Sequence, residues 1–365
     1  MGEWQTFCLK DLGKIVGGTT PSTNNPKNYG NKIAWITPKD LSTLQGRYIK
    51  KGSRSISRLG FKSCSCVLLP KHAILFSSRA PIGYVAIAKK RLCTNQGFKS
   101  IIPNKKIYFE FLYYLLKYHK DNISNIGGGT TFKEVSGATL GLFKVKIPPT
   151  YYEQQRIART LSMLDQKIEN NHKINELLHT LAYRIYEYYF KYKPKNAKLE
   201  QIIIENPKSS IMVKNAQKTQ DKYPFFTSGD NILFYPKAII DGRNCFLNTG
   251  GNAGIKFYVG KASYSTDTWC ICANEFSDYL YLLLSSIKTH INQSFFQGTS
   301  LKHLQKNLLK KYPIYMPSAH EIKKFNQIIM PLLTLISINT RISKKLEQIR
   351  DFLLPLLLKQ QVKPQ

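Results

Sequence analysis

The chain has 365 residues, 42% of them hydrophobic, and a formal net charge of +32 at pH 7. This length allows two or three domains with packed cores. The charge excludes an ordinary surface of balanced sign and predicts a polyanionic partner, either nucleic acid, an anionic membrane or an acidic protein. No apolar run is long enough to cross a bilayer, and the N-terminus lacks a signal-peptide core. We therefore expect a cytoplasmic protein with no membrane partner.

The seven cysteines give no evidence of a disulfide framework or a metal site. Their number is odd, and no two have the C-x-x-C spacing of zinc ligands. Cys64/Cys66 and Cys270/Cys272 each lie two residues apart in apolar, strand-like runs. Buried reduced thiols are therefore the favoured interpretation, and no metal ligand is predicted.

The first globular segment is predicted over residues 1–148. Short apolar runs alternate with Gly, Pro and Asn, as in SSRAPIGYVAIAKKRLCTNQGFKSI at 77–101, and this pattern is typical of strands and turns. A short helix is expected at YFEFLYYLLKYH. No Asp or Glu occurs from Leu41 to Phe109, although Lys and Arg recur there. We expect a polyanion to neutralise this surface.

A long helix is predicted over residues 149–193, since 151–190 contains neither Pro nor Gly. A second globular segment at 194–317 and a second long helix at 318–361 follow, and Pro331 is expected to kink or restart that helix. Both helices have an apolar seam of coiled-coil type with one Asn in register. The predicted seam residues are Leu164, Asn171, Ile174, Leu178, Leu181 and Ile185 in the first helix, and Leu335, Asn339, Ile342, Leu346, Ile349 and Leu353 in the second.

The second half of the chain repeats the first. Glu153 corresponds to Glu321, Asn171 to Asn339, and GTTFK at 129–133 to GTSLK at 298–302. The repeat predicts a pseudo-twofold α+β protein. Each half would contain a curved, mainly antiparallel sheet followed by a long helix, and the two helices would pair as a coiled coil.

A search for catalytic motifs finds none. There is no Gly-rich phosphate loop followed by Lys-Ser or Lys-Thr and no nuclease carboxylate pattern. In IPPT at 147–150, Ile147 stands where an amino-methyltransferase loop needs a polar residue. No catalytic residue is therefore predicted.

Polar loop clusters are the candidate binding residues. Lys and Arg side chains pair with guanine, Asn and Gln with adenine, and hydroxyls with bases or phosphates. In the first half the candidates are Thr37, Lys39, Asp40, Ser77, Ser78, Arg79, Asn95, Gln96, Thr130, Thr131 and Lys133. In the second half they are Thr227, Ser228, Arg243, Asn248, Asn252, Lys256, Thr299 and Lys302. The recurrence of such clusters in both halves favours double-stranded DNA as the partner.

The chain resembles the specificity (S) subunits of type I restriction–modification enzymes along essentially its whole length. The motifs that carry the resemblance are GTTPSTNNPKNYGNKIAWITPKDL, SSRAPIGYVAIA with CTNQGFKSI, GGGTTFKEVS, IPPTYYEQQRIARTLSMLDQKIE and RDFLLPLLL. The resemblance implies two target-recognition domains, each binding half of a split DNA sequence. It also implies that the two helices pack antiparallel and fix the gap between the half-sites.

The resemblance further implies that the chain is a non-catalytic subunit that binds no cofactor itself. Two methylation (M) subunits would bring S-adenosylmethionine and adenine-N6 chemistry, and restriction (R) subunits would bring ATP/Mg-dependent translocation and nuclease activity. The M subunits would dock on the helices near Glu153, Gln154, Gln155 and Arg156. The second helix begins PSAHEIKKF and lacks the Glu-Gln pair, so its docking surface is expected to differ.

Three alternatives stay open on sequence grounds. The chain could be a stand-alone nuclease or methyltransferase, although the missing motifs argue against this. It could be a basic coiled-coil interaction protein whose charge serves an acidic partner. It could also be the DNA-recognising subunit of a different methyltransferase system.

Overall fold

The computed structural model describes residues 3–129, 133–216 and 222–364. Contacts divide the chain into two compact units. Unit 1 contains Met1–Asn170 and Ser343–Gln365, and unit 2 contains Asn171–Ile342. Each unit therefore combines one globular part with a segment of each long helix.

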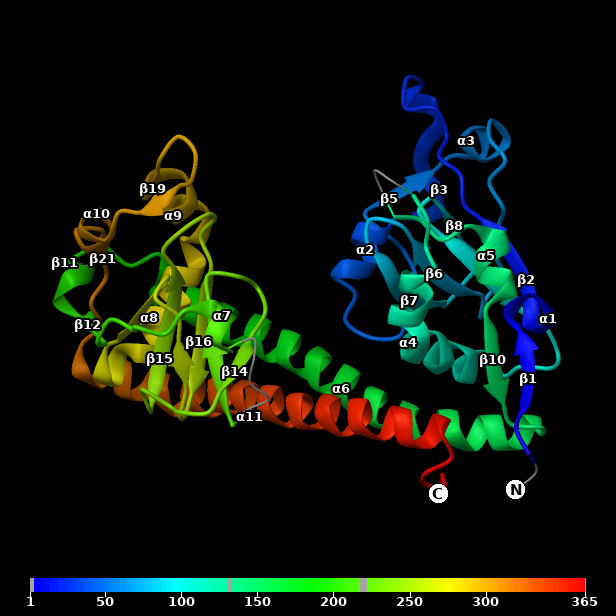
Figure 1. The fold of residues 1–365 in the computed structure, drawn as a ribbon. Helices are drawn as coiled ribbons and strands as arrows, with labels where there is room; N and C mark the ends of the chain where they lie inside the picture. The colour runs from blue at the N-terminus through cyan, green and yellow to red at the C-terminus, as the bar shows by residue number, and fades with distance from the viewer. Residues whose placement is uncertain (1–2, 130–132, 217–221, 365) are drawn as a thin grey trace. The chain divides into compact units, whose positions relative to one another are not determined.

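The globular part of unit 1 is a mixed α+β fold (Figure 1). Its strands are β1 (Gln5–Cys8), β2 (Gly13–Gly17), β3 (Tyr29–Ile36), β4 (Tyr48–Ile49), β5 (Arg54–Ile56), β6 (Ile74–Ser78), β7 (Ile82–Ala88), β8 (Cys93–Thr94), β9 (Lys99–Pro103) and β10 (Lys144–Ile147). Its helices are α1 (Leu9–Leu12), η1 (Pro26–Asn28), α2 (Pro38–Ser42), α3 (Arg58–Lys62), α4 (Phe109–Asn125) and α5 (Gly137–Leu142). The sheet orders are β2-β9-β6-β7-β4, β5-β3-β8 and β1-β10.

The core of unit 1 joins this sheet to the long helices. Phe76 on β6 and Phe111 on α4 are fully buried in one apolar cluster, which also contains Leu161 and Leu357 from the long helices. Burial of such side chains contributes about 1.5–3 kcal/mol each. The same apolar core therefore stabilises both the sheet and its attachment to the helices.

The globular part of unit 2 has the same character. Its strands are β11 (Ala197–Lys198), β12 (Ile204–Glu205), β13 (Tyr223–Phe226), β14 (Leu233–Tyr235), β15 (Arg243–Asn248), β16 (Ile255–Val259), β17 (Ser263–Tyr264), β18 (Thr268–Cys272), β19 (Phe296–Gln297), β20 (His303–Leu304) and β21 (Pro313–Ile314). Its helices are η3 (Leu199–Gln201), α7 (Val213–Ala216), η4 (Asn274–Phe276), α8 (Ser277–Ser286), α9 (Lys288–Ser294) and α10 (Lys306–Lys310). The sheet orders are β12-β18-β15-β16, β14-β13-β17, β11-β21 and β19-β20.

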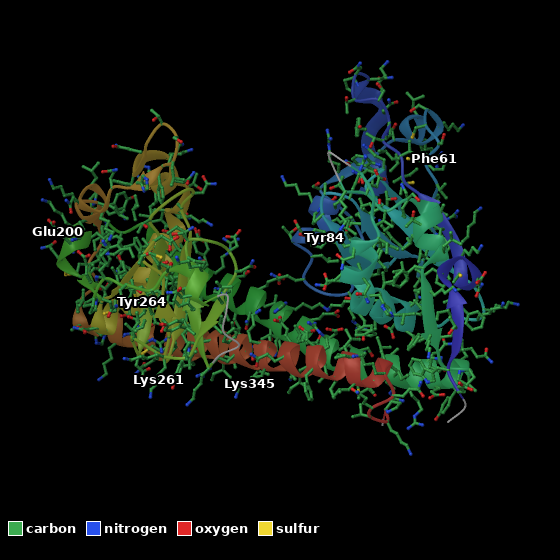
Figure 2. The ribbon with its side chains drawn as sticks, in the orientation of Figure 1. Phe61, Tyr84, Glu200, Lys261, Tyr264 and Lys345 are labelled. Carbon is green, nitrogen blue, oxygen red and sulfur yellow. The ribbon has the colours of Figure 1, made fainter. Side chains whose placement is uncertain are left out.

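Unit 2 also packs its sheet and helices into one apolar core. Leu247 on β15 and Leu280 on α8 are buried with Tyr186 and Leu333 from the long helices. A smaller cluster lies on another side of the sheet and contains Tyr264, which Figure 2 shows inside the globular part.

The repeat predicted from the sequence appears in the strand pairing. β3 pairs parallel with β8, with Ile36 opposite Thr94, and β13 pairs parallel with β17, with Phe226 opposite Tyr264. β4 and β7 are also parallel, and the other paired strands are antiparallel. The prediction of an α+β fold with mainly antiparallel sheets is confirmed.

The two long helices are α6 (Tyr151–Tyr186), extended by a π-helical turn η2 (Glu187–Lys191), and α11 (Ala319–Leu358). The Glu153 amide donates to the Thr150 hydroxyl (3.2 Å), and the Glu321 amide donates to the Ser318 hydroxyl (3.4 Å), so both starts are capped by a hydroxyl residue. The expectation that Pro331 restarts the second helix is wrong, because α11 continues through it.

Within each unit the segments of α6 and α11 run antiparallel. In unit 1, Asp165 pairs with Arg350 at 2.7 Å. In unit 2, Asn339 donates to Asn175 (3.0 Å), and Lys193 near the end of the first helix pairs with Glu321 near the start of the second. Partner numbers fall along α11 as they rise along α6, which confirms the antiparallel pairing.

The predicted seam is only partly correct. Asn171 and Asn339 are buried, and Leu178, Ile185 and Leu353 pack against the cores, while Leu164 and Leu346 are half-buried. Five predicted seam residues are instead 39–49% exposed, namely Ile174, Leu181, Leu335, Ile342 and Ile349. Each helix buries one flank against a globular part as well as its partner helix, and this shifts the buried face away from the heptad positions.

No helix within the described residues has the length and apolar character needed to span a membrane.

Candidate nucleic-acid interface

The predicted clusters of unit 1 come together at one end of its sheets. The Asn95 amide donates to the Ile36 carbonyl (2.9 Å), which joins the loops after β8 and β3. The Ser78 amide donates to Gly97 (2.8 Å), and the Val135 amide donates to Ser78 (3.0 Å). Three loops and the segment before α5 therefore form one hydrogen-bonded group, which we call loop group 1.

Three predicted side chains of loop group 1 are exposed: Lys39, Gln96 and Lys133. They provide two ammonium groups and one amide, which suit phosphate, guanine and adenine contacts. Thr130 and Thr131 lie outside the described residues.

Other predicted residues of loop group 1 hold its shape. Asp40 accepts hydrogen bonds from the Thr37 amide (2.7 Å), the Thr37 hydroxyl (2.8 Å) and the Ser53 amide (2.7 Å). Burial raises the pKa of Asp40, but the hydrogen bonds from Ser53 and Thr37 outweigh it and lower the pKa below its ordinary value. Asn95 likewise accepts from the Gly97 amide (3.0 Å).

The structure contradicts the prediction that the side chains of Ser77 and Ser78 contact DNA directly. Both are fully buried. The Ser77 hydroxyl donates to the Pro81 carbonyl (2.7 Å) and accepts from the Tyr84 amide (2.8 Å). The Ser78 hydroxyl donates to Gly97 (3.3 Å). All side chains of β6 are buried, including these two at its end. The two hydroxyls therefore hold the shape of the loop after β6.

The sequence predicted that Arg79 has no acidic partner within the protein. The structure contradicts this prediction. The Arg79 guanidinium lies 3.5 Å from the Glu134 carboxylate, which also pairs with Lys99 at 3.2 Å. Glu134 comes from a distant part of the chain. The absence of Asp and Glu near Arg79 in the sequence therefore did not show whether Arg79 has an acidic partner. The Arg79 side chain remains 37% exposed and faces solvent in part.

Unit 2 builds an equivalent arrangement, which we call loop group 2. The Ser265 amide donates to Phe226 (2.9 Å), the Thr249 amide to Asp267 (3.2 Å), and the Leu304 amide to Thr249 (3.0 Å). These three bonds correspond in turn to the three that join loop group 1. The repeat therefore extends to the hydrogen bonds that position the candidate loops.

Asn252, Thr299 and Lys302 are the exposed predicted residues of loop group 2. Asn248 and Thr227 are buried, so neither is supported as a direct contact. The Lys256 ammonium donates to the carbonyls of Thr227 and Gly229 (both 2.6 Å), and burial lowers its pKa. Lys256 therefore holds the loop that follows β13. The half-buried Ser228 donates to the Asp267 carbonyl and also belongs to this loop.

The structure contradicts the prediction that Arg243 contacts DNA. It lies at the start of β15, whereas loop group 2 lies at the other end of that strand. Its guanidinium pairs with the buried Asp278 and donates to the Thr334 hydroxyl (3.0 Å) on α11. The residue connects the sheet to the helix, since a buried carboxylate requires a charged partner.

Some residues of the loop groups were missed in the sequence-based prediction. The Thr20 hydroxyl donates to the Gln96 side chain, and the Thr249 hydroxyl donates to Asp267 (2.7 Å). The exposed Lys51 lies in the turn whose Ser53 amide reaches Asp40. The hydroxyl-rich run GTTPST was a usable signal for Thr20, whereas the proximity of Lys51 depends on the fold.

The predicted docking residues at the start of α6 divide into two kinds. The structure contradicts the prediction that Gln154 is a docking residue. Its side chain is buried, accepts a hydrogen bond from the Tyr108 amide (2.8 Å) and donates one to the Lys106 carbonyl (3.0 Å). Gln155 is exposed, Glu153 is half-buried, and Arg156 donates to the Pro364 carbonyl (2.6 Å).

A cavity of about 970 Å³ opens beside these residues in unit 1. It is lined by Tyr108, Glu110, Tyr152, Gln155, Arg156, Arg159, Ser162, Met163 and Gln166. Most of these lie on one face of α6, so the cavity is a groove along that helix.

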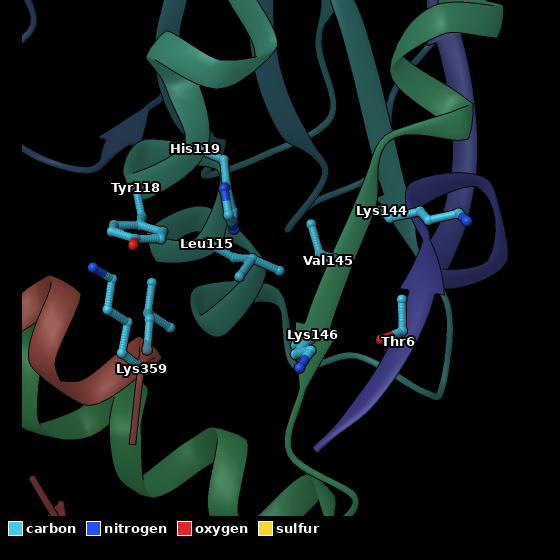
Figure 3. A pocket seen from close by; sticks show the side chains of 9 residues that line it. Thr6, Leu115, Tyr118, His119, Lys144, Val145, Lys146 and Lys359 are labelled. Carbon is cyan, nitrogen blue, oxygen red and sulfur yellow. The ribbon is translucent and has the colours of Figure 1, made fainter. Parts of the chain in front are cut away.

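A smaller cavity of about 330 Å³ lies between α4, β10 and the end of α11 (Figure 3). Leu115 and Val145 contribute apolar lining, and Lys144, Lys146 and Lys359 are nearby cations. None of the predicted DNA contacts lies there.

Across residues 3–129, 133–216 and 222–364, no group of three or more His, Cys, Asp or Glu side chains is placed to hold a metal ion.

Two matching loop groups on a strongly basic chain are typical of a protein that recognises DNA with two similar modules. The family model described as "Type I restriction modification DNA specificity domain" matches residues 1–180 and 195–348. The chain is 33% identical to the type I restriction enzyme MjaIX specificity subunit of Methanocaldococcus jannaschii, over 97% of this chain and 92% of that protein. It is 30% identical to the HindI specificity subunit of Haemophilus influenzae over 48% of this chain and 40% of that protein.

The fold also matches a crystal structure of the type I restriction–modification S subunit from M. genitalium. The TM-score is 0.63 at 18% identity, covering 97% of this chain and 96% of that chain. The chain therefore belongs to the family of type I restriction–modification DNA specificity subunits. In that role it is a non-catalytic component that supplies DNA sequence recognition.

Proposed function

We propose that the chain recognises a split DNA target through loop groups 1 and 2, one half-site for each. The observation that carries this proposal is the equivalence of the two groups, which are joined by the same three main-chain hydrogen bonds. A protein with two similar modules suits a target with two half-sites, because the spacing of half-sites follows the geometry of the protein.

The exposed side chains supply suitable chemistry. Gln96 and Asn252 can pair with adenine, and Lys39 and Lys302 can contact guanine or phosphate. With a net charge of +32, phosphate contacts should dominate the affinity. Binding should therefore weaken strongly as salt concentration rises.

We further propose that two methylation subunits dock on the long helices, one on each unit. In unit 1 the groove along α6 offers Gln155, Arg159 and Met163. In unit 2 a row of apolar side chains lies exposed on the helices: Ile174, Leu177, Leu181, Leu335 and Ile342. Exposed apolar rows of this kind mark interaction surfaces.

The chemistry would reside in these partners. We propose that the methylation subunits bind S-adenosylmethionine and methylate adenine N6, and that restriction subunits use ATP and Mg²⁺. Adenine methylation requires a flipped base, so the duplex must be held firmly while the base leaves the stack. The specificity chain would provide that hold in the cytoplasm, where the DNA lies.

The half-site assignment is tested by substituting one loop group at a time in the chain assembled with its methylation subunits. Gln96→Ala with Lys39→Ala should reduce affinity for the first half-site by about 1–3 kcal/mol per lost base contact. Asn252→Ala with Lys302→Ala should do the same for the second half-site. Binding is titrated on duplexes in which one half-site at a time is altered.

The matched control is Lys10→Ala, an exposed lysine on α1 at the opposite end of β2 from loop group 1. It removes the same charge and should not change half-site preference. If the loop variants and Lys10→Ala weaken all duplexes equally, the loops contact phosphate only and the assignment is wrong.

A further inference from the structure

Arg47 forms the centre of a buried ionic network in unit 1. Its side chain is 4% exposed, and it lies in the turn before β4. The guanidinium is 3.0 Å from Glu110 on α4 and 3.1 Å from Glu169 on α6. It also lies 4.0 Å from Asp165 on α6. One cation of the globular part thus contacts three carboxylates, two of them on a long helix.

The network continues into the second long helix. Asp165 accepts from Arg350 on α11 (2.7 Å) and from the Tyr114 hydroxyl on α4 (2.5 Å). Asp165 therefore connects the globular part, α6 and α11 in one place. All of these residues belong to unit 1.

The main chain of the same turn is held as well. The Arg47 amide donates to Glu169 (2.9 Å). Gly46 has a φ of +122°, and a Cβ atom there would lie 3.1 Å from the Glu169 side chain. Only glycine combines this backbone conformation with such a close approach. The turn is therefore fitted against α6 by both its side chain and its backbone.

Networks of this kind contribute specificity of arrangement more than net stability. Replacing a buried ion pair with apolar residues is often neutral for stability, because desolvation offsets the attraction. Its hydrogen bonds are directional, however, whereas the surrounding apolar core of Phe111 and Leu161 is not. Directional bonds of this kind are suited to fixing one angle between the sheet and the helices.

Unit 2 makes a simpler connection. Arg243 pairs with Asp278, which belongs to the globular part itself, and reaches α11 through Thr334 (3.0 Å) and the Met330 carbonyl (3.2 Å). That arrangement has one buried carboxylate and hydrogen bonds to one long helix. Arg47 in unit 1 therefore contacts more carboxylates than Arg243 does in unit 2.

We infer that Gly46, Arg47 and Asp165 are positioning residues for DNA specificity. They hold the globular part of unit 1 at one angle on the long helices and thereby restrict the enzyme to one spacer length between half-sites. The inference rests on the proposed function, since it requires a split target.

The test uses the full chain assembled with its methylation subunits and a set of duplexes. Each duplex contains both half-sites, with the spacer at its natural length or one base pair shorter or longer. Initial methylation rates are measured for the wild type and for Arg47→Met. The wild type should prefer its own spacer by about a hundredfold, and Arg47→Met by less than about tenfold, with unchanged half-site sequences.

Two further variants separate positioning from stability. Leu140→Ala removes a fully buried core side chain of unit 1 outside the network and should lower the melting temperature while keeping the spacer preference. Arg47→Lys keeps the charge without the guanidinium fork and should relax the spacer preference partially; it decides the question if Arg47→Met does not fold.

An unchanged spacer preference in both Arg47 variants would overturn the inference, as would an equal loss of preference in Leu140→Ala. A changed half-site sequence would also overturn it, because the turn would then contact bases. If the wild type methylates no split site on any duplex, the proposed function itself fails, and this outcome is distinct from the others.

Discussion

At the scale of single residues, Glu321 shows how one carboxylate fixes the start of a long helix. It accepts from the Ser318 amide and hydroxyl (both 2.9 Å) and from the Tyr315 hydroxyl (2.9 Å), and it pairs with Lys193. The bond from Lys193 and then those from Ser318 and Tyr315 lower the pKa of Glu321 from its ordinary 4.5 to about 2. Glu321 therefore combines a helix cap with an ion pair between the two long helices.

This pKa predicts a pH-dependent contribution to stability. Because the folded pKa is lowered, the stabilisation is present above about pH 4.5 and is lost as the pH falls toward 2. Glu321→Gln should lower the free energy of unfolding by roughly 0.5–1 kcal/mol at pH 7, a modest amount because solvent screens this half-buried site near the surface. The difference from wild type should shrink as the pH falls below about 4.5 and be much smaller at pH 2. Urea denaturation at both pH values measures it, and an equal difference at both would contradict the assignment.

At the scale of elements, each long helix has a buried face and an exposed apolar face. Leu333 is 1% exposed in the core of unit 2, whereas Leu177 is 70% exposed. The heptad pattern identifies the apolar positions of each helix but not the flank that a globular part covers. It therefore does not predict which apolar side chains are buried and which are exposed.

The two faces should respond differently to substitution. Leu333→Ala should destabilise the chain by about 2–5 kcal/mol through a cavity. Leu177→Asp should change stability by less than about 0.5 kcal/mol, because the side chain is already in solvent, yet it should weaken binding of a methylation subunit. Thermal melting and co-purification with the methylation subunit distinguish the two effects. Because the groove of unit 1 would still hold one methylation subunit, co-purification of two methylation subunits with Leu177→Asp would show that the exposed face of unit 2 is not a docking surface.

Sequence patterns predicted the elements and the repeat well, because both depend on local periodicity and self-similarity. Val135, two residues after GTTFK, and Leu304, two residues after GTSLK, make equivalent main-chain hydrogen bonds in the two units. The ionic network was not predictable in this way. Arg47 lies in a stretch without acids, and its partner Glu169 is 122 residues away along the chain. The burial of Gln154 likewise depends on the Tyr108 amide, which only the fold places beside it.

At the scale of the whole molecule, the chain consists of two similar recognition modules, each built together with a segment of both long helices. The family match spans both repeats, at residues 1–180 and 195–348. A non-catalytic subunit of this kind should determine which sequence is methylated without affecting the chemistry of transfer. Its removal should therefore abolish a methylation pattern.

The most direct test maps adenine methylation across the genome of cells that produce this chain with its methylation subunit, and compares them with cells that lack this chain alone. We expect deletion to remove one methylated motif made of two half-sites with a fixed spacer, and restoration of the chain to bring it back. Persistence of every methylated motif after deletion would contradict the proposal that this chain selects the target.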